Sequence, residues 1–347
     1  MTANKWMKRL QSMDGAVNVE VDPFRPDNLV RSPSPSFNWV FGKAGGIPKG
    51  FSVISYGEAK AGKSLTGYLL AGQLHKDDPE AIIVRFDTEM RSTLQQKGNW
   101  GIDYDRWMPF DGNDPTKVFD TITNEIEPLL AEGAPIKMII IDSLTMLAGL
   151  REGDAESISN VQMGDRAAMV SKGLKRLLPI IRKYNILFYA TAHMRANFDA
   201  GLYGPKLKAS LSWMEKHFFE LYLQVARDNS ADGKSDILGN KLENAGAKDF
   251  KGNKEITGHK IYIKNAECSW GGAGRTAEIT IDYEKGLINT HEEVFQLAVN
   301  LGLVERPNNR TYVLDGKNYS SKADFLEALK DEETAKKILE RIYNRDA

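Results

Sequence analysis

The chain of 347 residues has little of what would place it in a membrane or in an oxidising compartment. It has no apolar run near the roughly 20 residues that a membrane helix needs. Its first residues have no continuous apolar stretch of the kind found in secretory signals. The single cysteine, Cys268, cannot form an internal disulfide or a cysteine-cluster metal site. These absences favour a cytoplasmic protein with a free thiol.

Excess charge is also lacking, because the formal net charge is only −1. Any binding of nucleic acid must therefore depend on a local basic surface. No internal repeat of solenoid length occurs. What the chain does have is a hydrophobic content of 41%, enough for the core of one large α/β domain and a small accessory domain.

Short apolar segments alternate with helical segments from Phe51 onward, among them FSVISY, AIIVRFD, KMIIIDS and ILFYATAH. Near-continuous apolar strands in such an alternation predict an α/β fold with a mostly parallel sheet flanked by helices. Residues 227–259 are polar and have no steady period, so they predict an exposed insertion or hairpin. We divide the chain into an N-terminal helix or arm (1–31), the α/β core (32–288) and a small α+β C-terminal domain (289–347).

A phosphate-binding pattern lies between the first core strand and the next helix, where residues 57–64 read GEAKAGKS and fit GxxxxGK(S/T). Its glycines would let successive N–H groups face the phosphates at a helix N-terminus. Lys63 would reach the β and γ phosphates, and the Ser64 hydroxyl would bind Mg²⁺. An ordinary glycine turn is the alternative. The expected ATP-binding residues are Gly57, Glu58, Ala59, Lys60, Ala61, Gly62, Lys63, Ser64 and Leu65.

Three further strand ends carry polar groups that would complete such a site. Asp142 follows the apolar run MIII and would bind Mg²⁺ directly or through water, although a strand-end aspartate also commonly caps a turn. Glu89 in FDTEM would orient the attacking water, with Asp87 as a competing carboxylate or a turn cap. His193 would sense the γ phosphate; a buried, satisfied histidine is the alternative.

With these motifs in this order, the chain resembles the RecA family of homologous-recombination ATPases from about residue 32 to residue 341. FDTEM is similar to the family's strand with the catalytic glutamate, and MIIIDSLTML to its Walker B strand. The end of the chain is similar to the small C-terminal domain of the bacterial protein. The resemblance implies a DNA-dependent ATPase that forms helical filaments on single-stranded DNA and exchanges strands with homologous duplex DNA, assisted by single-strand-binding and loader proteins.

The resemblance also extends to subunit contacts, because KIYIKNAECSW is similar to a strand whose lysines reach a neighbour's ATP. It implies that Lys264, together with Lys216, neutralises phosphate charge from the neighbouring subunit. Two departures favour a bacteriophage member of the family: His193 replaces a usual glutamine, and Ala266 replaces a second lysine. Lys60 is an extra cation inside the nucleotide loop that would contact phosphate.

Two loops are expected to bind DNA, at residues 150–165 and 194–212. The second loop has cations and aromatic residues among glycines, which suits phosphate neutralisation and base contact. The first loop is acidic, so its contribution would come from the basic helix that follows. On residues alone, both features would be ordinary solvated surface. The expected DNA-binding residues are Met163, Arg166, Lys175, Arg176, Arg195, Asn197, Phe198, Tyr203, Lys206 and Lys208.

Two other functions stay open from the sequence. A ring-forming helicase with the same core is one, although fewer than 50 residues precede the core. The other is a recombination mediator or regulatory paralogue that binds ATP but hydrolyses it poorly. The residues His193 and Ala266 keep this second alternative open.

Overall fold

A large mixed sheet forms the centre of the protein in a computed structural model, which describes residues 3–13, 22–91, 100–147, 165–197, 207–228, 234–235, 241–248, 250–252, 254–308 and 310–344. The sheet has ten strands. They are β3 (Ser52–Gly57), β4 (Ile82–Asp87), β5 (Trp107–Asp111), β6 (Ile136–Asp142), β7 (Leu187–Ala196), β8 (Leu207–Ala209), β9 (Leu221–Arg227), β12 (Gly258–Cys268), β13 (Thr276–Asp282) and β14 (Gly286–Ile288).

The strand order is β14-β13-β12-β9-β3-β7-β6-β4-β5, with β8 paired to β7. The strands from β9 to β5 are all parallel, whereas β12, β13 and β14 add an antiparallel edge. This arrangement confirms the predicted α/β fold with a mostly parallel sheet.

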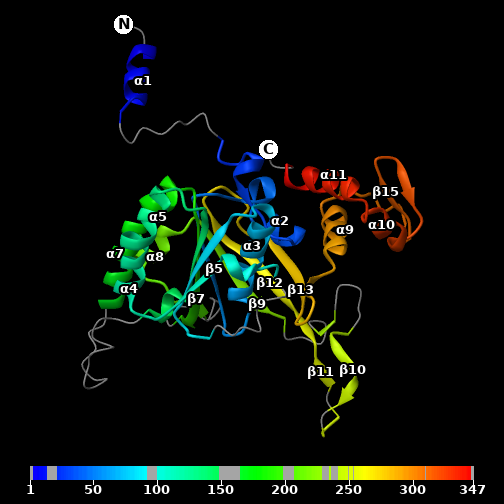
Figure 1. The fold of residues 1–347 in the computed structure, drawn as a ribbon. Coiled ribbons are helices and arrows are strands. Elements are labelled where there is room, and N and C mark those ends of the chain that lie inside the picture. The colour runs from blue at the N-terminus through cyan, green and yellow to red at the C-terminus, as the bar shows by residue number, and fades with distance from the viewer. Residues whose placement is uncertain are drawn as a thin grey trace.

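Helices cover both faces of the sheet (Figure 1). They are α2 (Pro35–Val40), α3 (Lys63–Asp77), α4 (Pro115–Asp120), the π-helical segment η5 (Thr121–Ile126), α5 (Glu127–Ala131), α7 (Asp165–Lys183) and α8 (Trp213–Phe218). Short 3-10 turns are η1 (Pro26–Asn28), η2 (Lys43–Gly45), η4 (Tyr104–Arg106) and η6 (Leu144–Met146). Two short strands, β1 (Leu29–Val30) and β2 (Ile47–Pro48), pair ahead of the core.

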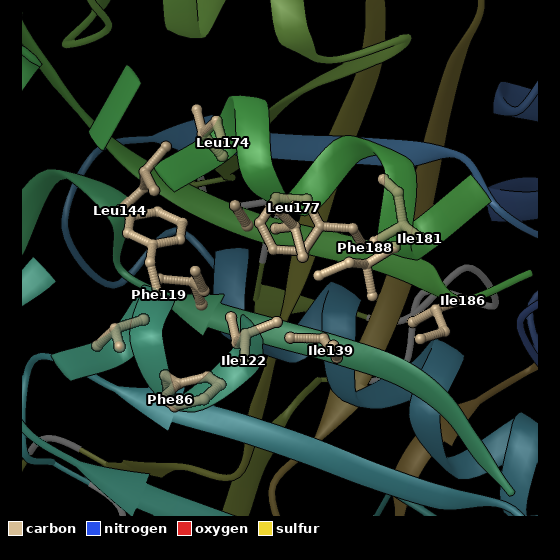
Figure 2. Packing of buried hydrophobic residues seen from close by; sticks show 14 of the residues in the cluster. Phe86, Phe119, Ile122, Ile139, Leu144, Leu174, Leu177, Ile181, Ile186 and Phe188 are labelled. Atoms are coloured by element: carbon tan, nitrogen blue, oxygen red, sulfur yellow. The ribbon is translucent and has the colours of Figure 1, made fainter. Parts of the chain in front are cut away.

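Consecutive residues of β6 pack into two different hydrophobic layers. Ile139 and Ile141 contact the layer that includes α4 and α7, and Met138 and Ile140 contact the layer that includes α3. Figure 2 shows the first layer, where Ile139 lies beneath aliphatic and aromatic side chains of the helices. Because both faces of the strand are buried, its sequence is apolar at successive positions rather than alternating.

Parallel strands end at the same edge of the sheet, and their register brings the candidate residues together there. Asp87 at the end of β4 is paired in register with Asp142 at the end of β6. Gly57 at the end of β3 is paired with His193 in β7. The sheet therefore assembles a site from segments that lie far apart in the sequence.

The sequence pattern predicted a hairpin that the structure contains, and it missed one strand at the edge of the sheet. The hairpin of β10 (Glu243–Lys248) and β11 (Lys254–Ile256) projects from the body of the protein, as predicted for residues 227–259 (Figure 1). The strand β5 was not predicted, since WMPFD contains a proline and no apolar run. Its position at the sheet edge makes Pro109 tolerable there.

The two ends of the chain differ in their contacts. The helix α1 (Ala3–Gln11) lies away from the sheet, with Trp6, Met7 and Leu10 half-exposed (Figure 1). The C-terminal elements share a hydrophobic cluster of their own. They are α9 (Thr290–Asn300), β15 (Tyr312–Leu314), β16 (Lys317–Tyr319), α10 (Lys322–Ala328) and α11 (Glu332–Tyr343).

Buried hydrogen bonds fasten this C-terminal part to α2. The Glu293 carboxylate accepts hydrogen bonds from the Ser34 hydroxyl at 2.6 Å and from the Ser36 N–H at 3.0 Å. The Tyr343 hydroxyl donates to the Pro35 carbonyl at 3.2 Å.

Among the helices that the structure describes, none has the length and apolarity to cross a bilayer.

Candidate functional site

The loop between β3 and α3 encloses one end of a cavity of about 460 Å³. Its two glycines are required by close packing. A Cβ atom on Gly57 would lie 2.1 Å from the Val225 carbonyl oxygen, and one on Gly62 would lie 2.5 Å from the Ile261 side chain. Gly62 also has a φ of +101°, which favours glycine. The loop residues that line the cavity are Ala59, Lys60, Ala61, Gly62, Lys63, Ser64 and Leu65.

Lys63 lines this cavity and is only 7% exposed. Its ammonium donates hydrogen bonds to the carbonyl oxygens of Gly57, at 3.2 Å, and Glu58, at 2.8 Å. Burial lowers the pKa of Lys63, and the negative charges of Glu89 and Asp142 oppose that effect. The loop therefore presents a positioned cation opposite two carboxylates, with room between them for an anionic ligand.

Arg85 in β4 links the two acids at the strand ends. Its guanidinium lies 3.2 Å from a carboxylate oxygen of Asp87 and 3.0 Å from one of Asp142. The Thr191 hydroxyl donates to the other Asp142 oxygen at 2.6 Å. Arg85 was not among the expected site residues, although a lone charge inside the apolar segment AIIVRFD was a usable signal. Its role is to hold Asp142 in a fixed orientation at the cavity wall.

The groups expected to bind Mg²⁺ fit that ion in their chemistry. Ser64 and Asp142 both line the cavity, and they offer the oxygen ligands that Mg²⁺ prefers. Each Asp142 oxygen already accepts one hydrogen bond. Because Mg²⁺ usually keeps several of its waters, contact between Asp142 and the ion through water suits this arrangement.

Glu89 and His193 form a pair in the lining of the cavity. His193 Nε2 lies 2.7 Å from Glu89 Oε1, and the Arg91 guanidinium lies 3.1 Å from Glu89 Oε2. The backbone N–H of His193 donates to the Thr145 hydroxyl at 3.1 Å. Asp87 is fully buried, and its two oxygens accept the N–H groups of Glu89 and Arg91. This geometry gives Asp87 the turn-capping role and leaves Glu89 beside the phosphate loop.

Aromatic and apolar side chains also line the cavity, including Tyr68, Trp100, Ile281 and Tyr283. His259 is another lining residue, with its Nδ1 atom 3.1 Å from the Tyr283 hydroxyl. Burial lowers the pKa of His259 to about 4, so the imidazole is neutral near pH 7. Such a lining suits the flat, polar-edged ring of a nucleobase. None of these residues was expected from the sequence.

Lys264 and Lys216, the two lysines expected to act on a neighbouring subunit, lie outside the cavity of their own chain. Lys264 is exposed on β12 and Lys216 is exposed on α8. Neither belongs to the described residues that line the cavity. Their action on a neighbour's ATP remains a prediction.

Several of the residues expected to bind DNA lie on β7, β8 or α7, or directly after β7. Arg195 lies directly opposite Lys208 in the antiparallel pair of β7 and β8, and Asn197 follows β7. Lys175 is exposed on α7. Of the other candidates, Met163, Phe198, Tyr203 and Lys206 lie outside the residues that the structure describes.

Two of the expected cations are already engaged within the chain. The Arg166 guanidinium donates to the Leu144 carbonyl at 2.9 Å and lies 3.2 Å from the buried Glu215 carboxylate. The Arg176 guanidinium lies 2.8 Å from the Asp120 carboxylate. Both contacts join neighbouring helices. They give these arginines a packing role, and their contact with DNA remains a prediction.

Known proteins with similar sequences were found for most of the chain. The family model of the RecA N-terminal domain matches residues 27–248. Protein RecA of Ruminococcus albus is 22% identical over 262 residues, which cover 76% of this chain and 58% of that protein. Protein RecA of Mycoplasma mycoides subsp. mycoides is 25% identical over 262 residues, covering 76% and 68%. Protein RecA of Paracoccus denitrificans is 23% identical over 266 residues, covering 76% and 65%. The chain thus spans 58% to 68% of the length of these relatives.

Proposed function

Because this chain belongs to the RecA family, we propose that it is a DNA-dependent ATPase that forms helical filaments on single-stranded DNA and catalyses homologous pairing and strand exchange. One observation carries the proposal. Lys63 and Ser64 of the phosphate loop face Asp142 and the Glu89–His193 pair across a single cavity. These are the groups that nucleotide binding, metal binding and water activation require.

The loop amides and Lys63 would bind the β and γ phosphates of ATP. Mg²⁺ held by Ser64 and, through water, by Asp142 supplies charge neutralisation at those phosphates when it is bound. Glu89 would accept a hydrogen bond from the attacking water and orient it toward the γ phosphate. His193 Nε2 lies 2.7 Å from Glu89 Oε1. Because His193 contacts the residue that would orient the water at the γ phosphate, it would sense whether that phosphate is present.

Assembly into a filament would complete the site from a second subunit. Lys264 and Lys216 are exposed cations that do not line the cavity of their own chain, which suits action on a neighbour's phosphates. The half-exposed apolar side chains of α1 offer a contact for the adjacent subunit. Repeated head-to-tail contacts that do not close produce a helical filament. Single-strand-binding and loader proteins would assist this assembly in the cytoplasm.

Single-stranded DNA should stimulate ATP hydrolysis, and Glu89→Gln should lower that stimulated rate roughly 10²- to 10⁴-fold while nucleotide binding persists. The exposed Glu125→Gln on η5 provides a matched control and should hydrolyse ATP at the wild-type rate. Undiminished hydrolysis by Glu89→Gln would remove Glu89 from the mechanism.

Electron microscopy tests the assembly separately. With a non-hydrolysable ATP analogue and single-stranded DNA, the protein should form helical filaments. Closed rings would support a helicase with the same core. ATP binding with no DNA-stimulated hydrolysis would support a mediator or regulatory role.

A further inference from the structure

Arg91, shortly after β4, lines the nucleotide cavity and pairs with the candidate catalytic carboxylate. One of its guanidinium nitrogens lies 3.1 Å from Glu89 Oε2. The Arg91 side chain is 74% exposed, whereas that of Glu89 is 16% exposed. A solvent-exposed cation thus lies beside the group that would orient the attacking water.

A fixed turn carries both charged side chains. The buried Asp87 carboxylate accepts the N–H of Glu89 through one oxygen and the N–H of Arg91 through the other, each at 3.1 Å. Met90 between them has a φ of +52°, a left-handed conformation that is uncommon for residues with a side chain. Because Met90 is 60% exposed, packing of its side chain does not account for this conformation. The turn itself therefore positions Arg91 beside Glu89.

The other arginine among the described lining residues is committed to a buried network. Arg85 lies between Asp87 and Asp142, and its side chain is 5% exposed. Arg91 instead keeps most of its side chain exposed while it pairs with Glu89. An exposed cation gains little from such a pair, because water screens its charge. Arg91 can therefore change its partner readily, whereas Arg85 cannot.

The γ phosphate of bound ATP would lie within reach of Arg91. A water oriented by Glu89 is about 3 Å from the carboxylate oxygen and about 3–3.5 Å from the phosphorus that it attacks. The γ phosphorus would therefore be about 6 Å from Glu89, a distance that an arginine side chain can span by rotation about its own bonds. A phosphate carries more negative charge than a carboxylate and matches the forked geometry of a guanidinium. The γ phosphate should therefore displace Glu89 as the partner of Arg91.

We propose that Arg91 is a catalytic cation for the ATP of its own subunit: it leaves Glu89 when ATP binds and donates hydrogen bonds to the γ phosphate. The inference rests on the proposed ATPase function and adds a residue to it. In hydrolysis the water oxygen bonds to the γ phosphorus, the bond from that phosphorus to the bridging oxygen breaks, and the proton of the water passes to Glu89 and then to solvent. Arg91 would stabilise the charge on the γ phosphate oxygens, while the Glu89 oxygen that it vacates accepts a hydrogen bond from the water. With ADP, which has no γ phosphate, Arg91 would stay on Glu89.

Isothermal titration calorimetry in the Glu89→Gln background, with Mg²⁺ present, separates a phosphate contact from an effect on Glu89. Glu89→Gln removes the carboxylate partner of Arg91 and slows hydrolysis, so ATP itself can be titrated. Adding Arg91→Ala should raise the Kd for ATP roughly tenfold or more and leave the Kd for ADP unchanged. Arg310→Ala, at an exposed arginine of the C-terminal part, is the matched control and should leave both values unchanged. An unchanged Kd for ATP, or an equal rise for ADP, would overturn the inference.

The rate of hydrolysis supplies a second readout, in protein that keeps Glu89. Arg91→Ala should lower kcat roughly 10²- to 10³-fold, as removal of one transition-state donor does. Arg91→Lys should recover part of that loss, because lysine keeps the charge and lacks the fork. An undiminished kcat in Arg91→Ala would also overturn the inference. A wild type whose hydrolysis single-stranded DNA does not stimulate would instead refute the proposed function, while the comparison of ATP with ADP would still decide the role of Arg91.

Discussion

Replacing the buried Glu293 by glutamine should change how stability depends on pH. Glu293 lies in the first turn of α9 and is 3% exposed. One of its oxygens accepts the Ser34 and Ser36 hydrogen bonds, and the other has no partner among the residues that the structure describes. Burial raises the pKa of Glu293 from its ordinary value of 4.5 to about 8.

The sign of the effect follows from proton binding. Between pH 4.5 and pH 8 the folded protein keeps a proton on Glu293 that the unfolded chain has released. The stabilisation is therefore complete below pH 4.5 and is lost as the pH rises through about 8. The free energy of unfolding should fall by up to about 1.4 kcal/mol for each pH unit in this window. Glutamine has the same shape and no charge, so Glu293→Gln should remove this slope.

Thermal unfolding measured from pH 5.5 to pH 9 tests this expectation. The Tm of the wild type should fall relative to that of Glu293→Gln as the pH rises, until the variant is the more stable protein. Glu292→Gln, at the less buried neighbouring position, is the control and should follow the wild type. Parallel Tm curves for the wild type and Glu293→Gln would refute the assignment of a buried, protonated carboxyl that fastens α9 to α2.

Two further changes test the packing of the nucleotide site. Arg85→Ala leaves the buried Asp87 and Asp142 without their shared cation, so it should lower the free energy of unfolding by about 3–5 kcal/mol in urea titrations. A loss below about 1 kcal/mol would mean that the acids do not depend on Arg85. Gly62→Ala combines an unfavourable φ with a clash against Ile261, and calorimetry should detect no ATP binding by a protein that stays folded. Wild-type affinity in that variant would show that the loop adapts.

The phosphate loop and the strand-end acids could be predicted because their signals are local. GEAKAGKS needs its glycines at fixed positions in one turn, and Asp142 follows a buried strand whose apolar run is unmistakable. Parallel strands then bring such ends to one edge, whatever their separation in the sequence.

The rest of the site depends on packing between distant segments. His259 in β12 and Tyr283, directly after β13, reach the cavity from strands that join the sheet beyond β9 in a register that no local pattern specifies. Arg176, which the sequence predicts to contact DNA, also pairs with Asp120 because α7 packs on α4, and no local pattern indicates that pair. The exposure of Trp213 at the start of α8 could not be predicted from a local pattern either, because an aromatic residue in a helix is ordinarily expected in the core.

Strand exchange between a single strand and a homologous duplex, with and without ATP, tests the proposed function most directly. The wild type should form exchanged product only with ATP, and Lys63→Ala, which lacks the loop cation, should form none. ATP hydrolysis by the wild type with no exchanged product would contradict the assignment of this protein as a recombinase.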